Sequence, residues 1–356
     1  MNSIKKNRIP RYNTLIRYAN MLRFGEIHTK IDPSTGLHAI IAIHNTKLGP
    51  AIGGCRFYNY KSAELALKDV LRLSYGMTLK AAACGLPHGG AKAVILKPRG
   101  DFDRQALFRS FGDFVNELNG RYITAVDVGS NIEDMTTIFE RTPFVIGARG
   151  PGRVDEDPSP STAKGVFRAI QAAIKFKWNQ DDCNGIRVAI QGVGHVGYTL
   201  AKLLSTHGAT VMISDINQDI VQKCVTECRV AAVLPQEIEN LECDIFSPCA
   251  MGGTITLDLI HRTHAKIIAG AANNQLAHHQ NPHAMLARDI IYLPDFLINS
   301  GGLINAAMTY TYQDLSMVEK KVDHIYDVVL TMLERAKASG KTPAAVAEEM
   351  AFERLM

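Results

Sequence analysis

Arg187-Val-Ala-Ile-Gln-Gly-Val-Gly-His-Val-Gly197 is the stretch that decides the fold of the second half of this chain. Its first five residues have the apolar and β-branched character of a buried strand, and the glycine pattern that follows opens a helix expected over Tyr198–His207. A second strand is expected after that helix, with Asp215 at its tip. A strand, a glycine-rich turn, a helix and a second strand in this order predict one unit of a doubly wound parallel sheet.

The three glycines have separate expected tasks. Gly192 permits a tight turn, Gly194 lets the backbone approach a pyrophosphate, and Gly197 allows close packing of helix on sheet. The helix N-terminus favours an anion, and a carboxylate at Asp215 can accept hydrogen bonds from a ribose 2′-hydroxyl and repel a 2′-phosphate. The sequence therefore predicts NAD as the cofactor, with a ligand-free strand–helix turn as the alternative. The predicted contacts are Gly192, Val193, Gly194, His195, Val196, Gly197 and Asp215.

The rest of the second half continues the same rhythm. Helical segments separate short strands of β-branched character, which is typical of a Rossmann-type doubly wound sheet. A long helical pattern begins after 299–302 and is strongest over 318–337, and a last short helix is expected over 343–355. The expected strands are 187–191, 210–214, 244–247, 266–269 and 289–293.

The first half also alternates strands and helices, which predicts an α/β domain. Leu37–Ile43 is expected to form a strand, after which the chain is expected to turn through Gly49-Pro50 and Gly53-Gly54. The stretch 147–160 is rich in glycine and proline and is the best candidate for a domain boundary. The other expected elements are helices over 62–84, 104–118, 131–141 and 162–177, and strands over 91–96 and 122–128.

Bulk composition excludes several classes of protein. A hydrophobic content of 46% with 21% charged residues is ordinary for a globular chain of 356 residues, and the net charge of +4 comes from interspersed charges without a basic stripe, which argues against nucleic-acid binding. The basic start Lys5-Lys6-Asn7-Arg8 is not followed by the apolar stretch of a signal peptide, and the longest apolar run, 39–43, is too short to cross a bilayer. The seven cysteines are interpreted as reduced thiols of a cytoplasmic protein, a zinc site at Cys224 and Cys228 being the less favoured alternative.

Two lysines, Lys80 and Lys92, are the candidates for chemistry in the first half. Lys80 lies near the end of an expected helix, whereas Lys92 follows the glycine turn Gly89-Gly90 and begins a short strand. A lysine surrounded by glycine and alanine can be shielded from water, and because this disfavours its charged form its pKa falls and it can act as a general base. A phosphate-binding or solvated lysine is the alternative for either residue.

Two further segments are expected beside the cofactor because each follows a predicted strand. Ser247–Gly253 is placed to border the ribose or the nicotinamide. Gly270–Gln275 puts the amides of Asn273 and Asn274 at the carboxyl edge of the sheet, where ligands bind, although such a pair also commonly forms a turn.

Together these segments resemble the amino acid dehydrogenases of the glutamate/leucine/phenylalanine/valine dehydrogenase superfamily, most closely the leucine dehydrogenases. The resemblance extends over nearly the whole chain. It is carried by residues 49–56, 76–96, 122–130, 158–163, 191–197, 214–217, 248–250, 268–276 and 294–305.

The resemblance implies roles for individual residues. Lys80 would hold the substrate α-carboxylate, Lys92 would be the catalytic lysine, and Asp127 would be its acidic partner in proton transfer. Glutamate-specific relatives carry a lysine just before the Gly-Gly-x-Arg turn, where this chain has Ile52, so an aliphatic substrate side chain is expected. The remaining substrate contacts would be Gly53, Asn274, Leu303 and Ala306, and the remaining cofactor contacts Thr162, Ala250 and Asn273.

The resemblance also implies an architecture of two α/β domains. A substrate and oligomerisation domain over 1–147 would precede an NAD-binding Rossmann domain over 148–324, with the C-terminal helices 325–356 packing back on the first domain. The segment 150–157, Gly-Pro-Gly-Arg-Val-Asp-Glu-Asp, departs from the pattern of the relatives.

The implied activity is NAD-dependent oxidative deamination of a branched-chain L-amino acid, with leucine as the expected substrate. Phenylalanine or valine dehydrogenase is the alternative enzyme, and a catalytically silent NAD-binding regulatory protein is the alternative outside the enzymes. Intact Lys80, Lys92 and Asp127 argue against the silent protein. The expected partners are a small amino acid and further copies of the chain, from a dimer to an octamer, with no nucleic acid, membrane or metal ion.

Overall fold

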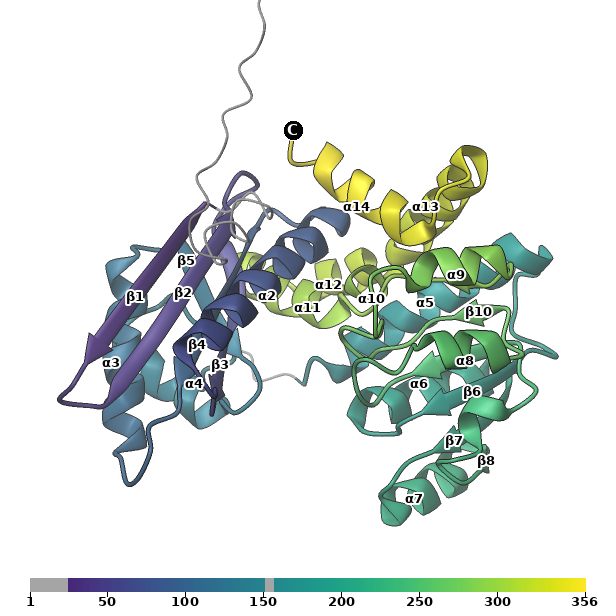
Figure 1. Cartoon of the computed structure of the whole chain (residues 1–356), viewed down its shortest axis with the longest axis horizontal. Coiled ribbons are helices and arrows are strands. Elements are labelled where there is room, and N and C mark those ends of the chain that lie inside the picture. The colour runs from purple at the N-terminus through teal and green to yellow at the C-terminus, as the bar shows by residue number, and fades with distance from the viewer. Residues whose placement is uncertain (1–24, 151–156) are drawn as a thin grey trace, which may run out of the picture. The chain divides into compact units, whose positions relative to one another are not determined.

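The computed structural model describes residues 25–150 and 157–356. Its elements form two compact units: residues 25–78 with 88–150, and residues 79–87 with 157–356 (Figure 1). The basic start of the chain and most of the divergent segment 150–157 lie outside the described residues. The expected boundary at residues 147 and 148 therefore stays a prediction.

A mixed five-stranded sheet forms the centre of the first unit. Its strand order is β1-β2-β4-β3-β5, with antiparallel pairing from β1 through β4 and parallel pairing of β3 with both β4 and β5. The sheet thereby carries parallel strands next to antiparallel ones, as the expected α/β class allows. The strands are β1 (Glu26–Asp32), β2 (Leu37–Asn45), β3 (Ala51–Tyr58), β4 (Gly89–Leu96) and β5 (Tyr122–Val126).

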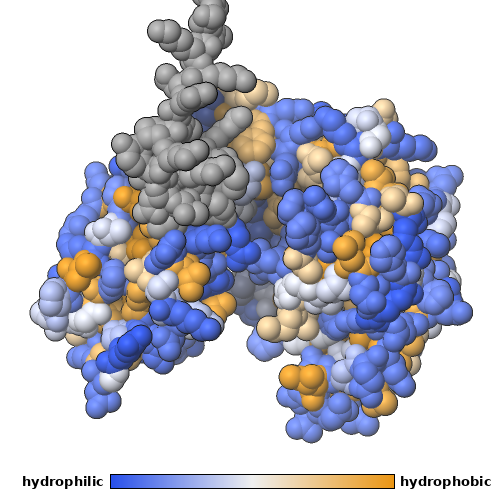
Figure 2. Space-filling model, in the orientation of Figure 1, coloured by the Kyte–Doolittle hydropathy of each residue, from blue (hydrophilic) through white to orange (hydrophobic). Residues whose placement is uncertain are grey.

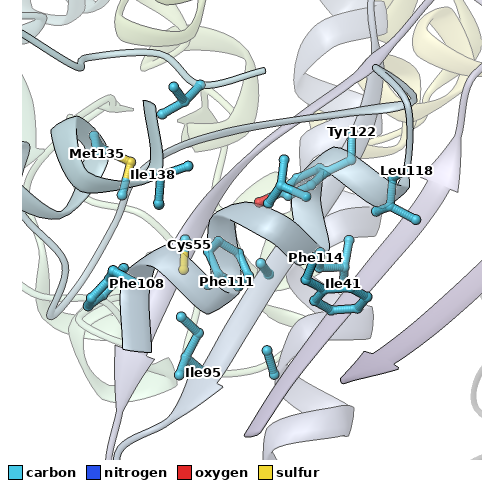
Figure 3. Close-up of a cluster of buried hydrophobic side chains, with 14 of the residues drawn as sticks. Ile41, Cys55, Ile95, Phe108, Phe111, Phe114, Leu118, Tyr122, Met135 and Ile138 are labelled. Atoms are coloured by element: carbon cyan, nitrogen blue, oxygen red, sulfur yellow. The ribbon is translucent and has the colours of Figure 1, made fainter. Parts of the chain in front are cut away.

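Helices cover both faces of this sheet because successive strand residues point to opposite sides. Odd-numbered residues such as Ile41 and Ile95 pack against α3 (Arg104–Glu117) and α4 (Ile132–Phe139), where Phe108, Phe111 and Phe114 fill the core (Figure 3). The even-numbered face packs against α2 (Ala63–Ala83) through Ile40, Ala42, Val94, Ala66, Val70 and Leu71. Residues 52, 54, 56 and 92 fall on this second face, so the pleat alone brings them together.

The expected turn at Gly53-Gly54 was wrong, because these glycines lie inside β3. A Cβ at Gly53 would lie 1.7 Å from the carbonyl oxygen of Ala91, and one at Gly54 would lie 2.8 Å from that of Val126. The glycines therefore allow β4 and the end of β5 to approach β3 closely, which a local pattern cannot distinguish from a turn. Strand β1 was not predicted at all, and its alternating half-buried residues make it an edge strand.

Six parallel strands form the sheet of the second unit. The sequence predicted a parallel sheet and five of these strands, and it did not predict β8. Their order, β11-β10-β9-β6-β7-β8, is that of the doubly wound dinucleotide-binding sheet, in which the chain order reverses between β6 and β9. Ligands bind such sheets at this reversal, outside the carboxyl ends of the strands. The strands are β6 (Arg187–Gln191), β7 (Thr210–Ser214), β8 (Ala231–Ala232), β9 (Ile245–Pro248), β10 (Ile267–Ile268) and β11 (Ile291–Tyr292).

Helices lie on both sides of this sheet. On one side, apolar residues of α8 (Leu257–Arg262), α9 (Asn281–Ala287) and the short helix η1 (Ile238–Asn240) form a core with Phe246 and Tyr292. On the other, α6 (His195–Thr206) contacts β6 and β7 and packs on α5 (Ser159–Trp178). Helix α6 begins three residues before the predicted start at Tyr198, directly after Gly194. The remaining short helices are α7 (Gln218–Cys228) and α10 (Asp295–Ile298).

The long helical pattern near the C-terminus is three helices rather than one. They are α11 (Gly301–Tyr312), α12 (Leu315–Asp323) and α13 (Ile325–Ser339), followed by α14 (Pro343–Glu353). Gln313 takes a left-handed conformation that ends α11, and Asp314 caps α12, so two local signals break the pattern. Helix α13 packs on α5, and α14 contacts α13 and β11. The expected return of residues 325–356 to the first domain stays a prediction.

The cysteines and the surface of the described residues have ordinary properties. All seven cysteines are free, and six of them are buried. On the face shown in Figure 2, hydrophilic residues predominate over both units, with apolar residues scattered among them, as on ordinary protein surfaces. None of the helices in the described part of the chain combines the length and the apolar character needed to cross a membrane.

Candidate functional site

Lys92 and Asp127, the two predicted catalytic residues, form a direct ion pair. Lys92 lies on β4 and is only 6% exposed, and its Nζ is 3.1 Å from Oδ2 of Asp127, which directly follows β5. The backbone NH of Asp127 donates to Oγ of Ser130, and this hydroxyl also contacts the carbonyl of Cys55 at 2.8 Å. The loop after β5 is therefore held against β3, which keeps the carboxylate beside Lys92.

Burial and neighbouring charge shift the pKa values of this pair. Burial is the largest cause for Lys92 and lowers its pKa, Asp127 opposes this, and the positive charge of Arg56 lowers it further. For Asp127, burial alone would raise the pKa, but Lys92 and Arg56 together bring it below its usual value. The pair therefore combines an ionised carboxylate with a lysine that gives up its proton more readily than a solvated one, which suits Lys92 to act as a general base.

Arg56 contacts the Lys92–Asp127 pair and is absent from the predicted site. Its Nε donates to Oδ2 of Asp127 at 2.9 Å, and its Nη1 donates to Oδ2 of Asp69 on α2, also at 2.9 Å. Asp127 therefore receives Arg56 and Lys92 on the same oxygen. The sequence could have indicated this position of Arg56, because Ile52, Gly54 and Arg56 alternate as residues on one face of a strand do. The assignment of Gly53-Gly54 to a turn excluded that interpretation.

The other predicted substrate residues of this region are placed as follows. Ile52 is 2% exposed on β3, on the sheet face that α2 covers, and the carbonyl of Gly53 accepts a 2.7 Å hydrogen bond from the hydroxyl of Tyr122. Lys80 lies partly buried in the last turn of α2, where a helix terminus favours a cation. Residues 79–87 belong to the second compact unit, so the pairing of Lys80 with Lys92 in one site stays a prediction.

The glycine turn after β6 has the geometry that its sequence predicts. Gly192 has φ +95°, and a Cβ there would lie 2.7 Å from Cβ of Ala250. A Cβ at Gly197 would lie 2.0 Å from the carbonyl oxygen of Gly192, whereas nothing stands within 4 Å of one at Gly194. Gly194 also begins α6 without a side-chain cap, so the first NH groups of the helix are available to an anion.

Asp215 closes this turn from the tip of β7. Its Oδ2 accepts the backbone NH of Val193 at 2.8 Å and its Oδ1 accepts that of Asn217 at 3.0 Å. The carboxylate is thereby fixed beside the glycine turn, where the ribose of a dinucleotide is expected. His195 is exposed, with its Nδ1 3.6 Å from Oδ2 of Asp157, and Val196 is partly buried in the same turn of α6. These residues fit a dinucleotide, and its binding stays a prediction.

The asparagines after β10 are exposed at the edge of the sheet. Asn274 has φ +53°, and its carbonyl accepts the backbone NH of Gly253 at 2.8 Å. The backbone of Asn274 therefore forms a turn, which was the alternative given for the Asn273-Asn274 pair. The side-chain oxygen of Asn273 accepts a 2.8 Å hydrogen bond from the amide of Asn299, a buried residue absent from the predicted site. This bond orients the NH₂ group of Asn273 away from Asn299. Ala250 is exposed beside Gly192.

The last predicted residues lie on helices of the second unit. Thr162 is in the first turn of α5, and its hydroxyl donates to the carbonyl of Pro158 at 3.0 Å. Leu303 and Ala306 are one turn apart on α11, and both are partly buried. Within residues 25–150 and 157–356, no group of three or more histidine, cysteine, aspartate or glutamate side chains is arranged to hold a metal ion.

Comparison with protein families assigns both parts of the chain. Residues 23–144 match the Glu/Leu/Phe/Val dehydrogenase dimerisation domain, and residues 155–224 and 217–356 match the Glutamate/Leucine/Phenylalanine/Valine dehydrogenase domain. These two matches cover nearly the whole chain, and the gap between them, residues 145–154, overlaps the stretch 147–160 that the sequence predicts as a boundary.

Individual relatives agree with this assignment. Leucine dehydrogenase of Bacillus cereus is 45% identical over 325 residues, which is 91% of this chain and 88% of that protein. Phenylalanine dehydrogenase of Caldalkalibacillus thermarum is 40% identical over 91% of this chain and 89% of its own. The crystal structure of L-tryptophan dehydrogenase from Nostoc punctiforme has a TM-score of 0.86 at 38% identity, covering 95% of this chain and 98% of that one. This chain belongs to the Glu/Leu/Phe/Val dehydrogenase family and is an amino acid dehydrogenase.

Proposed function

We propose that the chain is an NAD-dependent L-amino acid dehydrogenase that deaminates branched-chain substrates, with leucine preferred. The observation that carries this proposal is the buried Lys92–Asp127 pair on the same sheet face as the aliphatic Ile52. A base, a carboxylate and an apolar wall on one face are what oxidation of an apolar amino acid requires.

Lys92 and Asp127 would divide the proton transfers of the reaction. A bound nicotinamide supplies the acceptor for the hydride that leaves the substrate Cα. Lys92, in its neutral form, would take a proton from the water that attacks the resulting iminium. Since Lys92 and Arg56 keep Asp127 ionised, this carboxylate would first accept a hydrogen bond from the substrate ammonium group. It would then take one proton from that ammonium group before the hydride leaves Cα, and it would return this proton to the departing ammonia, so that the proton count balances.

The uncharged side chain of Ile52 would determine which substrate side chains are accepted. The glutamate side chain would bring a carboxylate to Ile52, which has no charge or hydrogen-bond donor to offer, and burying an unpaired carboxylate costs several kcal/mol. An aliphatic side chain would instead gain ~0.8 kcal/mol for each buried CH₂ group. Leu303 and Ala306 stay predicted substrate contacts. Ala306 is small, so a phenylalanine preference is the second candidate.

A substrate panel tests this proposal. The formation of NADH is measured at alkaline pH with leucine, isoleucine, valine, phenylalanine, tryptophan and glutamate, and kcat/KM is compared. Leucine is expected to rank first and glutamate last. Glutamate turnover comparable to that of leucine would refute the role of Ile52, and a phenylalanine preference would change only the substrate. Cofactor binding without oxidation of any amino acid would identify the silent NAD-binding protein instead.

We further propose that the enzyme works as a homo-oligomer in the cytoplasm. The match of residues 23–144 to a dimerisation domain supports self-association, and the seven free cysteines support a reducing compartment.

A further inference from the structure

A continuous row of alternating charges extends from Lys92 to the surface of the first unit. Lys92 contacts Asp127 at 3.1 Å, Arg56 joins Asp127 and Asp69 at 2.9 Å each, and Arg72 contacts the second oxygen of Asp69 at 3.2 Å. The side chains of Lys92, Asp127, Arg56 and Asp69 are all 20% exposed or less, whereas that of Arg72 is 51% exposed. Charges buried to this degree are costly, so the row is not an ordinary solvated surface pair.

Arg56 occupies the centre of this row and is held at both ends of its guanidinium group. Its Nε points to Asp127 after β5, and its Nη1 points to Asp69 on α2. Tyr60 donates its hydroxyl to the same oxygen of Asp69 at 2.7 Å, which fixes Asp69 in turn. Since a planar fork with two separate partners has little rotational freedom, Arg56 determines where Oδ2 of Asp127 lies.

We propose that Arg56 is a positioning residue of the reaction: anchored by Asp69, it fixes the Asp127 carboxylate against Lys92. The permanent positive charge of Arg56 also lowers the pKa of Lys92. The inference rests on the proposed roles of Lys92 and Asp127. Lysine in place of Arg56 could reach only one of the two carboxylates, because an ammonium group has no fork. The guanidinium group, which keeps its charge at every working pH, is therefore required.

Other ionisable groups near the pair make weaker or opposite contributions. Cys55 on β3 is fully buried, and burial, reinforced by Asp127, raises the pKa of its thiol, so it stays neutral. His44 on β2 contacts the hydroxyl of Thr78 on α2 at 2.8 Å. Burial and Asp69 raise the pKa of Tyr60, which therefore stays a neutral donor. Arg56, in contrast, lowers the pKa of Lys92.

The pH dependence of oxidation tests this inference, with Arg72→Gln as the matched control. Arg56→Gln removes the positive charge that repels protonated Lys92. It also removes one of the two cations that share Oδ2 of Asp127, so this oxygen binds Lys92 more strongly. Both changes raise the pKa of Lys92. Because the base must be neutral, the acid limb of kcat/KM is expected to move to higher pH, with kcat about 10–100-fold lower, the range expected when a reacting group is misplaced. Arg72→Gln, which removes an exposed cation that contacts Asp69 and not Asp127 among the described residues, should leave the profile unchanged.

Two further variants separate charge from position. Arg56→Lys keeps the charge, so kcat should fall with a smaller displacement of the acid limb than in Arg56→Gln. Asp69→Asn keeps Arg56 charged but releases one end of its fork, so kcat should fall while the acid limb does not move to higher pH. A merely structural role would lower the amount of folded enzyme in all three variants without moving the profile of the folded fraction.

A measurement that does not need activity distinguishes this inference from the proposed function. The rate at which cyanate carbamylates Lys92, followed by peptide mass spectrometry against pH, reports the neutral form of Lys92 directly. Arg56→Gln should displace this curve to higher pH even if no amino acid is oxidised. An unchanged carbamylation curve and acid limb in Arg56→Gln would overturn the inference and leave the proposed function standing. If Arg56→Gln does not fold, the same two curves of Arg56→Lys decide.

Discussion

At the scale of single residues, the chemistry of Lys92 depends on forces that oppose each other. Removal from water lowers its pKa, the contact with Asp127 raises it, and the charge of Arg56 lowers it again, with a net fall. Burial without Asp127 would leave a lysine with nothing to orient it. Asp127 without Arg56 would bind the proton of Lys92 more tightly.

The first prediction concerns Lys92. Lys92→Ala should lower kcat by ~10²–10⁴, the usual range for the loss of a general base, while the affinity for NADH stays the same. Lys97→Ala is the control, because Lys97 follows the same strand and is exposed. Stopped-flow kinetics gives kcat, and fluorescence titration gives the NADH affinity. Turnover of Lys92→Ala close to that of Lys97→Ala would remove Lys92 from the mechanism.

The second prediction concerns Asp215. The unchanged enzyme should have a higher kcat/KM with NAD than with NADP, because the carboxylate would face the 2′-phosphate of NADP across a few ångströms. Asp215→Ser should narrow this difference. It also removes the acceptor of the Val193 NH, so some loss of NAD affinity is expected as well. Asp219→Ser, in the exposed first turn of α7, is the control. Equal use of both cofactors by the unchanged enzyme would contradict the role of Asp215.

At the scale of elements, glycines bring the functional strands together. Gly54 lets Asp127 approach β3, with only 2.9 Å left between a Cβ at this position and Cβ of Asp127. A Cβ at Gly90 would lie 2.1 Å from the backbone nitrogen of Thr78, so Gly90 likewise lets α2 lie directly on β4. The face that carries Lys92 and Arg56 therefore owes its close packing to residues without side chains.

The third prediction compares two glycine substitutions in the first unit. Gly53→Ala should destabilise the protein by at least about 1–3 kcal/mol, the usual cost of overpacking, because its Cβ would overlap the backbone of β4. Gly76→Ala should stabilise by about 0.5–1 kcal/mol, since Gly76 lies inside α2 with nothing within 4 Å of its Cβ position. Thermal unfolding at one scan rate measures both. A melting temperature for Gly53→Ala equal to that of the unchanged protein would refute the close approach of β3 and β4.

At the scale of the whole molecule, the chain consists of two units with different kinds of sheet. The mixed sheet of the first unit carries the ion pair, and the parallel sheet of the second carries the glycine turn. Oxidation of an amino acid by a dinucleotide needs both, so neither unit alone is expected to be active.

The fourth prediction concerns assembly. Light scattering at micromolar protein concentration should give at least twice the chain mass of 39.0 kDa, in line with the dimerisation-domain match. Repeating the measurement over a tenfold dilution separates a stable oligomer from weak association. A mass of one chain at every concentration would contradict the proposed self-association.

The sequence by itself determined those features that depend on neighbouring residues. The strand Arg187–Gln191, the tight turn at Gly192, the close helix packing at Gly197 and the parallel sheet were all predicted, because each shows in a local sequence pattern. The approach of a pyrophosphate to Gly194 stays a prediction. Only the tertiary structure decided that Gly53-Gly54 lie in a strand and that Arg56 joins Asp127 to Asp69, residues 71 and 13 positions away along the chain. The reason is physical: a glycine pair permits a turn and a close strand approach equally well, and only the neighbouring strands decide between them.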